Sequence, residues 1–368
     1  MAKYFIGLMS GTSMDAVDAV LVDLSSLRPH IISTTSTSIP YDLKERLLKL
    51  NLEQFIELSE LAKADYQIAK LSADTVYHLI KKTTITIKDI IAIGSHGQTI
   101  YHQPKADPPS SIQIGDPNLI AEQTQITTVA DFRRRDIACG GEGAPLVPAF
   151  HRHFFHSKKE IRTIVNIGGM ANITALSTNL NAPIKGFDTG PGNVLMDYWC
   201  QQQQNKSYDE NGDWASSGQI NHNLLESFLN DPYFTTPPPK STGRELFNEN
   251  WLNKKIKTNP LLAPEDIQAT LCELTAQSIT HAIEHYAPET QQTIICGGGV
   301  HNKVLMERLH TLNPHPVSSS EDFGIHPDWV EAVAFAWLAQ QTIHRQPGNL
   351  PSSTGASHPA ILGGVYYA

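Results

Sequence analysis

The stretch Ile6–Asp18, with the sequence IGLMSGTSMDAVD, places a turn of small, hydroxyl-bearing and acidic residues between two apolar runs. Tyr4–Met9 before the turn and Val17–Leu24 after it predict a strand, a tight turn and a second strand. Glycines let the backbone approach a ligand closely, hydroxyls and amides can donate to phosphate oxygens, and carboxylates can hold a hard cation. The residues with these properties are Gly7, Ser10, Gly11, Thr12, Ser13, Asp15 and Asp18. The segment therefore predicts a hairpin that binds phosphate and magnesium.

A turn of this composition between strands is also common as a purely structural element. The standard nucleotide-binding loops fit less well, because GK[ST] occurs nowhere in the chain and the glycine spacing in this turn is not GxGxxG. Further motifs are needed to choose between a structural turn and a phosphate site.

Length and composition are those of an ordinary globular enzyme. The 368 residues are too many for one simple core and predict two domains or lobes. The net charge of −9 argues against nucleic acid or an anionic membrane as the main partner. The four cysteines contain no CxxC pair, and no apolar run reaches the roughly 18 residues of a membrane span. We therefore expect a cytoplasmic protein with reduced thiols.

The opening pattern returns in the second half of the chain. Arg162–Leu176 reads RTIVNIGGMANITAL, in which Gly168 and Gly169 separate two apolar, β-branched runs and are expected to allow a turn with positive φ. A third glycine cluster lies in Thr293–Asn302, TIICGGGVHN, between an expected strand and an expected helix. Its glycines would accept a flat ring or a phosphate near a helix N-terminus. Three such loops at strand ends favour a duplicated nucleotide-binding architecture.

Helices and strands alternate along the chain, which predicts the α/β class. Helices are expected over 56–82, 264–286, 302–312 and 327–344, and further strands over 90–94, 111–114 and 125–130. We place lobe I at 1–130, with the strand-like segment 350–368 as a candidate addition, and lobe II at 131–349.

Several motifs in order resemble the anhydro-N-acetylmuramic acid kinase family. They are IGLMSGTSMD, GSHGQT (94–99), DFRRRDIACGGEGAPLVP (131–148), NIGGMANIT, GFDTGPGN (186–193), CGGGVHN and WVEAVAFAWLA (329–339). The family's first turn usually reads GTSMDG, whereas Ala16 replaces the last glycine here. The resemblance implies the two-lobed sugar kinase, actin and Hsp70 fold, with duplicated ribonuclease H-like lobes around a central cleft.

The resemblance also implies an activity. The family adds water across the 1,6-anhydro bond of anhydro-N-acetylmuramic acid and phosphorylates the freed O6 from ATP with Mg²⁺, in peptidoglycan recycling. Asp188 is then expected to be the base that activates water, and Asp15 to hold magnesium. A homodimer is a further expectation from the family.

The expected ATP-binding residues come from the three glycine loops. They are Gly11, Thr12, Ser13, Met14, Asp15, Ala16, Val17, Asp18, Asn166, Gly168, Gly169, Gly297, Gly298, Gly299 and Asn302.

The expected substrate-binding residues are His96, Arg133, Arg135, Glu142 and Asp188. A guanidinium can bind the lactyl carboxylate of a muramic sugar in bidentate fashion, and Arg133 and Arg135 would share a face if their segment is extended. The sequence does not separate these two arginines.

Each assignment has a structural alternative. An Asp before Thr-Gly is often a turn or cap residue, an Arg run is often a solvated face, and a buried His is often structural. Glu331 at a helix start stabilises the helix dipole in any case, and it is also a candidate for the nucleotide or metal side. Two alternatives to the leading function also stay open: a kinase or phosphatase of the same superfamily with another substrate, and a nucleotide- and sugar-binding sensor without turnover.

Overall fold

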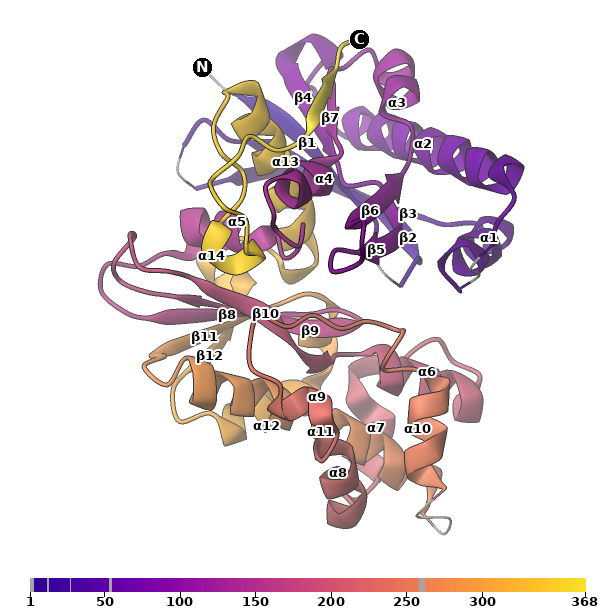
Figure 1. Cartoon of the computed structure of the whole chain (residues 1–368), viewed down its shortest axis with the longest axis vertical. Coiled ribbons are helices and arrows are strands. Elements are labelled where there is room, and N and C mark those ends of the chain that lie inside the picture. The colour runs from indigo at the N-terminus through magenta and orange to yellow at the C-terminus, as the bar shows by residue number, and fades with distance from the viewer. Residues whose placement is uncertain (1–2, 12, 27, 53–54, 258–261) are drawn as a thin grey trace. The chain divides into compact units, whose positions relative to one another are not determined.

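The structure is a computed structural model that describes residues 3–11, 13–26, 28–52, 55–257 and 262–368. Its contacts divide the chain into two compact units. Unit 1 comprises 1–154 and 329–368, and unit 2 comprises 155–328 (Figure 1).

Unit 1 is built on a six-stranded sheet with the order β13-β7-β4-β1-β2-β3. The first three strands form an antiparallel meander, and β4 and β7 then add in parallel beside β1. A separate antiparallel pair is formed by β5 and β6. The strands are β1 (Tyr4–Met9), β2 (Ala16–Asp23), β3 (His30–Ser38), β4 (Ile90–Ser95), β5 (Gln98–Gln103), β6 (Ser110–Ile114), β7 (Thr128–Ala130) and β13 (Gly364–Tyr366).

Helices cover both faces of this sheet. Ile6 and Leu8 point into a core shared with the helices α1 and α2, so Gly7 between them faces the other side. A Cβ at Gly7 would lie 1.8 Å from the main-chain oxygen of Ala332, because the backbone of α13 packs directly on β1. The helices of unit 1 are α1 (Tyr41–Leu52), α2 (Leu58–Lys81), α3 (Pro117–Thr124), α4 (Phe132–Ala138), α5 (Val147–Phe155), α13 (Val330–Ile343) and α14 (Pro351–Thr354), with a 3-10 turn η1 (Ile87–Asp89).

Unit 2 is built on a five-stranded sheet with the order β10-β9-β8-β11-β12. Again three strands form an antiparallel meander, and β11 and β12 add in parallel beside β8. The strands are β8 (Arg162–Ile167), β9 (Met170–Leu176), β10 (Lys185–Pro191), β11 (Gln292–Cys296) and β12 (Val317–Ser319).

The core of unit 2 packs apolar side chains of the sheet, such as Ile167 and Phe187, against the long helix α11. Pro264 at the first turn of α11 has no N–H to leave unpaired, which favours a helix start there. The helices of unit 2 are α6 (Val194–Gln204), α7 (Asp213–Ser217), α8 (His222–Leu229), α9 (Pro232–Thr235), α10 (Glu249–Ile256), α11 (Pro264–Tyr286) and α12 (Lys303–Leu312), with 3-10 turns η2 (Glu210–Gly212), η3 (Gly298–His301) and η4 (Ser320–Phe323). A further 3-10 turn, η5 (Pro327–Trp329), precedes α13.

The two sheets share one topology. In each, the order is third strand, second, first, fourth and fifth. The first three strands pair antiparallel, and the first with the fourth and the fourth with the fifth pair parallel. Unit 1 then adds β13, which pairs antiparallel with β7. The α/β class and the duplicated lobes expected from the sequence are confirmed. The β1–β2 and β8–β9 turns occupy equivalent positions in the two sheets.

The observed units differ from the expected lobes at both boundaries. The helices α4 and α5, expected in lobe II, belong to unit 1, where Phe132 contacts Phe335 and Phe150 contacts Trp337 through their rings. The helix α13 also belongs to unit 1, because it packs on β1. The C-terminal segment, a candidate addition to lobe I, ends in β13, which pairs with β7 of the first sheet.

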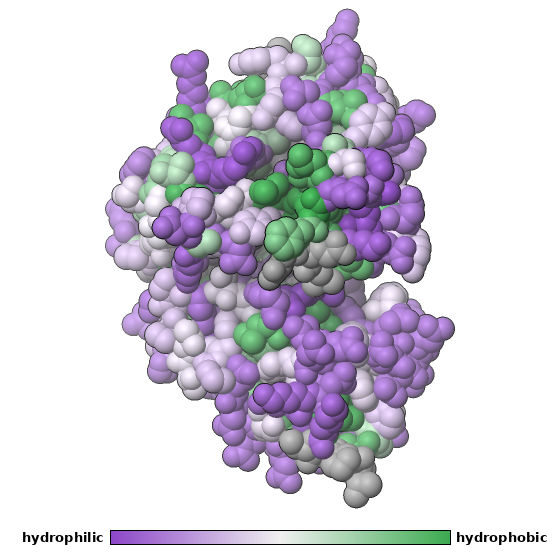
Figure 2. Space-filling view, turned by 45° about the vertical axis from the view of Figure 1, so that its right-hand side comes forward, coloured by the Kyte–Doolittle hydropathy of each residue, from purple (hydrophilic) through white to green (hydrophobic). Residues whose placement is uncertain are grey.

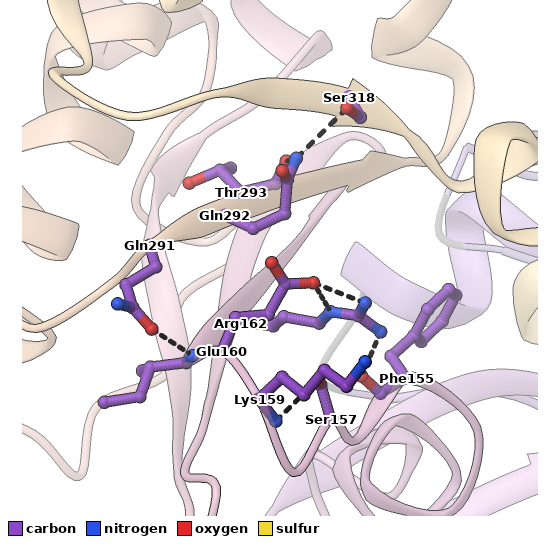
Figure 3. A network of polar contacts seen from close by, with 10 residues as sticks. Phe155, Ser157, Lys159, Glu160, Arg162, Gln291, Gln292, Thr293 and Ser318 are labelled. Atoms are coloured by element: carbon purple, nitrogen blue, oxygen red, sulfur yellow. Dashed lines mark hydrogen bonds and ion pairs between the residues drawn. The ribbon is translucent and has the colours of Figure 1, made fainter.

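A polar network fastens the start of β8 in unit 2 (Figure 3). The Arg162 guanidinium donates to a Glu160 carboxylate oxygen and, at 3.0 Å, to the main-chain oxygen of Phe155. The Gln291 side chain accepts from the main chain of Ile161 at 2.9 Å. This end of the strand is opposite the glycine turn, so we assign the network a structural role.

Hydrophilic residues predominate on the face shown in Figure 2, and apolar residues gather in a few places. Among the described residues, no helix combines the length and the apolar character that a membrane span requires.

Candidate functional site

The β1–β2 turn is held by side chains from other segments of unit 1. The Ser10 hydroxyl donates to Gln98 Oε1 at 2.6 Å, and Gln98 Nε2 donates to the main-chain oxygen of Gly11 at 3.3 Å. Met14 closes the turn by donating its N–H to Gly11 at 3.1 Å, with a positive φ of 56°. Its side chain is buried in the core below. These contacts hold Ser10, Gly11 and Met14, and a Cβ at Gly11 would meet nothing nearer than Ser13 Oγ at 4.0 Å.

Asp15 presents an exposed carboxylate at the end of this turn. Its Oδ1 lies 2.5 Å from Lys44 Nζ on α1, and 66% of its side chain is exposed. Ala16 is the first residue of β2, so the departure from the family's glycine lies at a strand start rather than inside the turn. Val17 is buried, and Asp18 lies opposite Met9 on the strand pair. Thr12, an expected ATP contact, lies outside the described residues.

His96 is buried beside the first turn. Its Nδ1 is 3.2 Å from the main-chain oxygen of Ser10, and its Nε2 is 2.9 Å from a guanidinium nitrogen of Arg133. Because a guanidinium can only donate, Nε2 must accept and Nδ1 must carry the proton that is donated to Ser10. The contacts therefore select a neutral His96 in one tautomer.

Electrostatics agree with this assignment. Burial, and then the charge of Arg133, lower the pKa of His96 to about 3. Burial lowers the pKa of Arg133 to about 10, against the opposing charges of Glu331 and Asp136. At neutral pH the pair is a cationic arginine beside a neutral histidine, so the guanidinium charge is not cancelled by its nearest partner.

Arg133 and Arg135 do not share a face, contrary to the expectation for an extended segment. Residues 132–138 form the helix α4, in which positions two apart point to different sides. Arg133 is partly buried and also donates to the main-chain oxygen of Gly143 at 2.8 Å. Arg135 is exposed. The structure thus separates two candidates that the sequence left together.

Asp136 is a buried carboxylate that the sequence reasoning missed. Its Oδ1 accepts from the Asn349 side chain at 2.7 Å and from the Thr354 hydroxyl at 2.8 Å, and its Oδ2 accepts from the N–H of Gly143 at 2.8 Å. The same Gly143 accepts from Arg133, so Asp136 fixes the loop that orients the arginine. Asn349 and Thr354 lie more than 200 residues along the chain, and a second acidic residue within DFRRRD is the single sequence signal for it.

Glu142 and Glu331 also belong to unit 1. The Glu142 carboxylate lies 3.1 Å from Lys105 Nζ, and its main-chain N–H donates to Thr354 at 2.7 Å. Glu331 lies in the first turn of α13, and its charge opposes the lowering of the Arg133 pKa by burial. His96 and Arg133 are thus in contact, and Glu331 acts on Arg133 through its charge. Glu142 lies in the adjoining loop.

The β8–β9 turn in unit 2 is held by main-chain groups. Gly168 donates to Met170 at 3.1 Å and accepts from the N–H of Asn193 at 2.8 Å, while Gly169 accepts from Gly192 at 2.9 Å. A Cβ at Gly192 would lie 2.3 Å from the oxygen of Gly168. The expected positive φ at Gly168 and Gly169 is wrong, because the GFDTGPGN loop supports the turn without it.

The third glycine loop packs against the end of β8. Gly297 has a φ of 80°, and a Cβ there would lie 2.4 Å from Asn166 Oδ1. A Cβ at Gly299 would lie 2.3 Å from the side chain of Ile167. Only open space surrounds a Cβ at Gly298, whose nearest neighbour is Asn193 Nδ2 at 4.0 Å. Asn302 caps α12 by accepting from the N–H of Leu305 at 3.0 Å, so a structural role accounts for its side chain.

Asp188 lies on β10 next to a register shift. Its Oδ2 accepts from the main-chain N–H of Thr242 at 2.9 Å, and its main-chain N–H donates to Lys240 at 3.2 Å. Its main-chain oxygen accepts from the Tyr233 hydroxyl at 2.7 Å. The segment 233–242 of unit 2 therefore contacts Asp188 at three points, one on the carboxylate and two on the main chain.

The model of the family "Anhydro-N-acetylmuramic acid kinase" matches residues 3–368 of this chain. The chain belongs to the anhydro-N-acetylmuramic acid kinase family. It is 49% identical to the anhydro-N-acetylmuramic acid kinase of Coxiella burnetii (strain RSA 493 / Nine Mile phase I), over 99% of this chain and 97% of that protein. The enzyme of the same name from Shewanella frigidimarina is 49% identical over 100% and 99% of the two chains. The one from Pseudomonas syringae pv. tomato is 48% identical over 100% of both.

For this member of the anhydro-N-acetylmuramic acid kinase family, the candidate residues form two sets. Unit 1 contributes the first turn and the cluster around His96 and Arg133, and unit 2 contributes the two glycine loops and Asp188. Among the described residues, no group of three or more His, Cys, Asp or Glu side chains could hold a metal ion. A metal ion at Asp15 would need further ligands, such as water and the phosphates of a substrate. Mg²⁺ is commonly bound in this way, by one or two carboxylates, water and substrate phosphates.

Proposed function

We propose that this chain is an ATP-dependent kinase that opens the 1,6-anhydro ring of anhydro-N-acetylmuramic acid and phosphorylates O6. The product would be N-acetylmuramic acid 6-phosphate, a step of peptidoglycan recycling. The observation that carries this proposal is the family match over residues 3–368, supported by relatives of that name at up to 49% identity.

The reaction exchanges bonds at C1 and O6 of one sugar. A water oxygen attacks C1 on the face opposite O6, the C1–O6 bond breaks, and its electron pair goes to O6. O6 then bonds to the γ-phosphorus of ATP, and ADP leaves with the electrons of the broken P–O bond. The water gives one proton to a base. Phosphoryl capture of O6 replaces the acid that protonates the leaving oxygen in an inverting glycosidase.

Asp188 is the base in this proposal. The N–H of Thr242 donates to its Oδ2, which limits the rotation of the carboxylate. A carboxylate that is positioned before the substrate arrives need not be reoriented during the reaction.

Arg133 is the proposed partner of the lactyl carboxylate, and His96 orients the arginine. Arg133 is chosen over Arg135 because its guanidinium is partly buried, where a charge interaction is less weakened by water. Glu142, which precedes Gly143 in the loop that contacts Arg133, is proposed to accept hydrogen bonds from sugar hydroxyls.

The nucleotide is assigned to the glycine loops. A Cβ at Gly11, Gly168 or Gly298 would meet no atom nearer than 3.7 Å. These glycines leave the main chain uncovered by a side chain of their own, which suits a close approach to phosphate or a flat ring. Asp15 would hold Mg²⁺ that arrives with the phosphates, and the exposed hard oxygen there fits such an ion. When bound, the ion neutralises charge on the transferred phosphoryl group. We also propose a cytoplasmic location and a homodimer.

Product analysis tests the function directly. The purified chain is incubated with anhydro-N-acetylmuramic acid, ATP and Mg²⁺, and the products are followed by mass spectrometry and proton NMR. We expect ADP and a sugar that has gained one water and one phosphoryl group, with the first anomer formed having its C1 oxygen opposite the former O6. A phosphorylated sugar with an intact anhydro ring would contradict the hydrolytic step. Binding of both ligands without turnover would support a sensor instead.

A further inference from the structure

Lys240 is a buried ammonium for which neither the sequence nor the family match suggests a role. It lies between α9 and α10, and 8% of it is exposed. Its Nζ is 3.0 Å from the main-chain oxygen of Tyr233 and 3.5 Å from that of Phe234. It also lies 4.5 Å from the centre of the Tyr233 ring. Burying a lysine charge costs free energy, so a buried lysine at this position needs a compensating role.

The segment that Lys240 fastens is the one that holds Asp188. The main-chain oxygen of Lys240 accepts from the Asp188 N–H, the Tyr233 hydroxyl donates to the Asp188 oxygen, and Thr242 donates to the carboxylate. The ammonium binds the same Tyr233 whose hydroxyl reaches Asp188. Removal of the ammonium would break the contact between Lys240 and Tyr233, near the two ends of the segment 233–242.

The charges around this segment are complementary. Burial lowers the pKa of the Lys240 ammonium, and the Asp188 carboxylate opposes that shift. Burial is also the main cause that raises the pKa of Tyr233, with Asp188 and Glu245 adding to it. The phenol therefore stays protonated and remains a donor. The charges of Lys240 and Asp188 stabilise each other.

We infer that Lys240 is a positioning residue for Asp188, whose ammonium keeps the carboxylate ionised and fastens the segment that orients it. This role rests on the proposed function, in which Asp188 is the base. A base is active only when deprotonated, so a neighbouring cation extends its working range to lower pH.

A purely structural lysine would behave differently. If Lys240 only linked main-chain oxygens, its removal would lower activity by the same factor at every pH. If it also stabilises the Asp188 charge, its removal raises the pKa of Asp188 and moves the acidic limb of the pH profile to higher pH.

The test compares Lys240→Met with a matched control, Lys255→Met. Lys255 also donates to a main-chain oxygen, that of Ser227 on α8, and lies 5.6 Å from the centre of the Trp251 ring on α10. Both contacts are with helices of unit 2 rather than with the segment 233–242, so this control reports the cost of losing a similar lysine. Lys240→Gln keeps a neutral donor and carries the same test if Lys240→Met does not fold. Lys240→Arg keeps the charge and should therefore behave much like wild type.

Two readouts are measured for each variant. The first is kcat/KM against pH, whose acidic limb reports the essential base of the free enzyme. The second is the titration of the Asp188 carboxyl carbon by NMR in protein labelled with 13C-aspartate, with the signal assigned by its loss in Asp188→Asn. For a neutral residue at 240 we expect both midpoints to rise by about one pH unit. Lys255→Met should leave both unchanged.

The outcomes separate the two proposals. Equal midpoints in wild type and the neutral Lys240 variants would overturn the role of Lys240, even if their turnover is lower. A wild-type chain that does not convert anhydro-N-acetylmuramic acid would instead overturn the proposed function. The NMR titration needs no turnover, so it decides the coupling between Lys240 and Asp188 in that case as well.

Discussion

The two units share one strand order but hold their polar groups in different ways. In unit 1 the first turn and Arg133 are held by side chains, namely those of Gln98, His96 and Asp136. In unit 2 the second turn is held by main-chain groups of residues 192–194, and Asp188 by the main chain of Lys240 and Thr242 together with the Tyr233 hydroxyl. A duplicated architecture therefore does not imply a duplicated sensitivity to mutation. Unit 1 should respond to the loss of side chains, and unit 2 to added Cβ atoms or to a changed charge.

The largest expected effect is on catalysis in unit 2. In Asp188→Asn the amide oxygen can still accept from Thr242, so the main-chain support should survive while the base is lost. We expect both ligands to bind and turnover to fall at least ~100-fold, the usual scale for loss of a general base. Steady-state kinetics and calorimetry of ligand binding measure this.

Asp266→Asn is the matched control for Asp188→Asn. Its carboxylate also accepts a main-chain N–H in unit 2, that of Gln219 at 2.7 Å. Turnover of this variant should stay near that of wild type. Near-normal turnover of Asp188→Asn would show that another group is the base.

The next effect is on sugar binding in unit 1. Arg133→Met removes a charged donor and also leaves His96 Nε2 without its partner. We expect the KM for the sugar to rise roughly 10- to 100-fold, from the 1.5–3 kcal/mol of a hydrogen bond to a charged group, with the KM for ATP little changed. Arg135→Met removes an exposed charge and should change neither constant much. The reverse ranking of the two variants would assign the sugar carboxylate to Arg135.

A third effect compares the glycines of the two turns. A Cβ at Gly192 would meet the oxygen of Gly168 at 2.3 Å, whereas a Cβ at Gly11 meets nothing nearer than Ser13 Oγ at 4.0 Å. Gly192→Ala should lower the free energy of unfolding by about 1–3 kcal/mol, the usual cost of overpacking. Gly11→Ala should change it by less than about 0.5 kcal/mol. Equal losses in urea unfolding would contradict the different construction of the turns.

The effect that is smallest at neutral pH is a pH dependence of stability in unit 1. The pKa of His96 is about 3 in the folded chain against an ordinary value of 6.5, so the unfolded chain binds the proton more readily. Stability should therefore fall as the pH falls from about 6.5 toward 3, by up to about 1.4 kcal/mol per pH unit for one such group.

His96→Gln tests this dependence, because the glutamine amide offers one donor and one acceptor but does not titrate. The slope of unfolding free energy against pH between about 4 and 6 should decrease by about 1.4 kcal/mol per pH unit, the contribution of one bound proton. Part of the slope should remain, because burial also lowers the pKa of His151 to about 3. An unchanged slope would mean that His96 is protonated in the folded chain.

The sequence predicted those parts of the fold that depend on neighbouring residues. Helix α11 was expected over 264–286 and is found as Pro264–Tyr286, because the proline start and the apolar periodicity act locally. The strand–turn–strand pattern of both glycine hairpins was also confirmed. The lobe boundaries were not predictable in this way, because α13 joins unit 1 through packing on a strand more than 300 residues earlier.

The candidate site also has parts that the sequence could show and parts that depend on contacts between distant residues. Motif positions such as His96 and Asp188 could be named from the sequence, and their catalytic and binding roles stay predictions. The sequence could not show that α4 separates Arg133 from Arg135, since an RRR run has no clear periodicity. Nor could it show Asp136 or Lys240, whose roles arise from contacts with distant residues. A buried charged group is visible only once its surroundings are known.

The pairing of β13 with β7 has a consequence for biosynthesis. Unit 2 is one continuous segment, 155–328, so all of its strands are available before the last part of the chain is translated. Unit 1 needs α13 and β13 from beyond residue 328, and until they emerge β1 lacks its helix and β7 lacks its neighbour. The segment made first is thus the last to complete its fold, and the nascent chain must hold an unfinished sheet while unit 2 is synthesised.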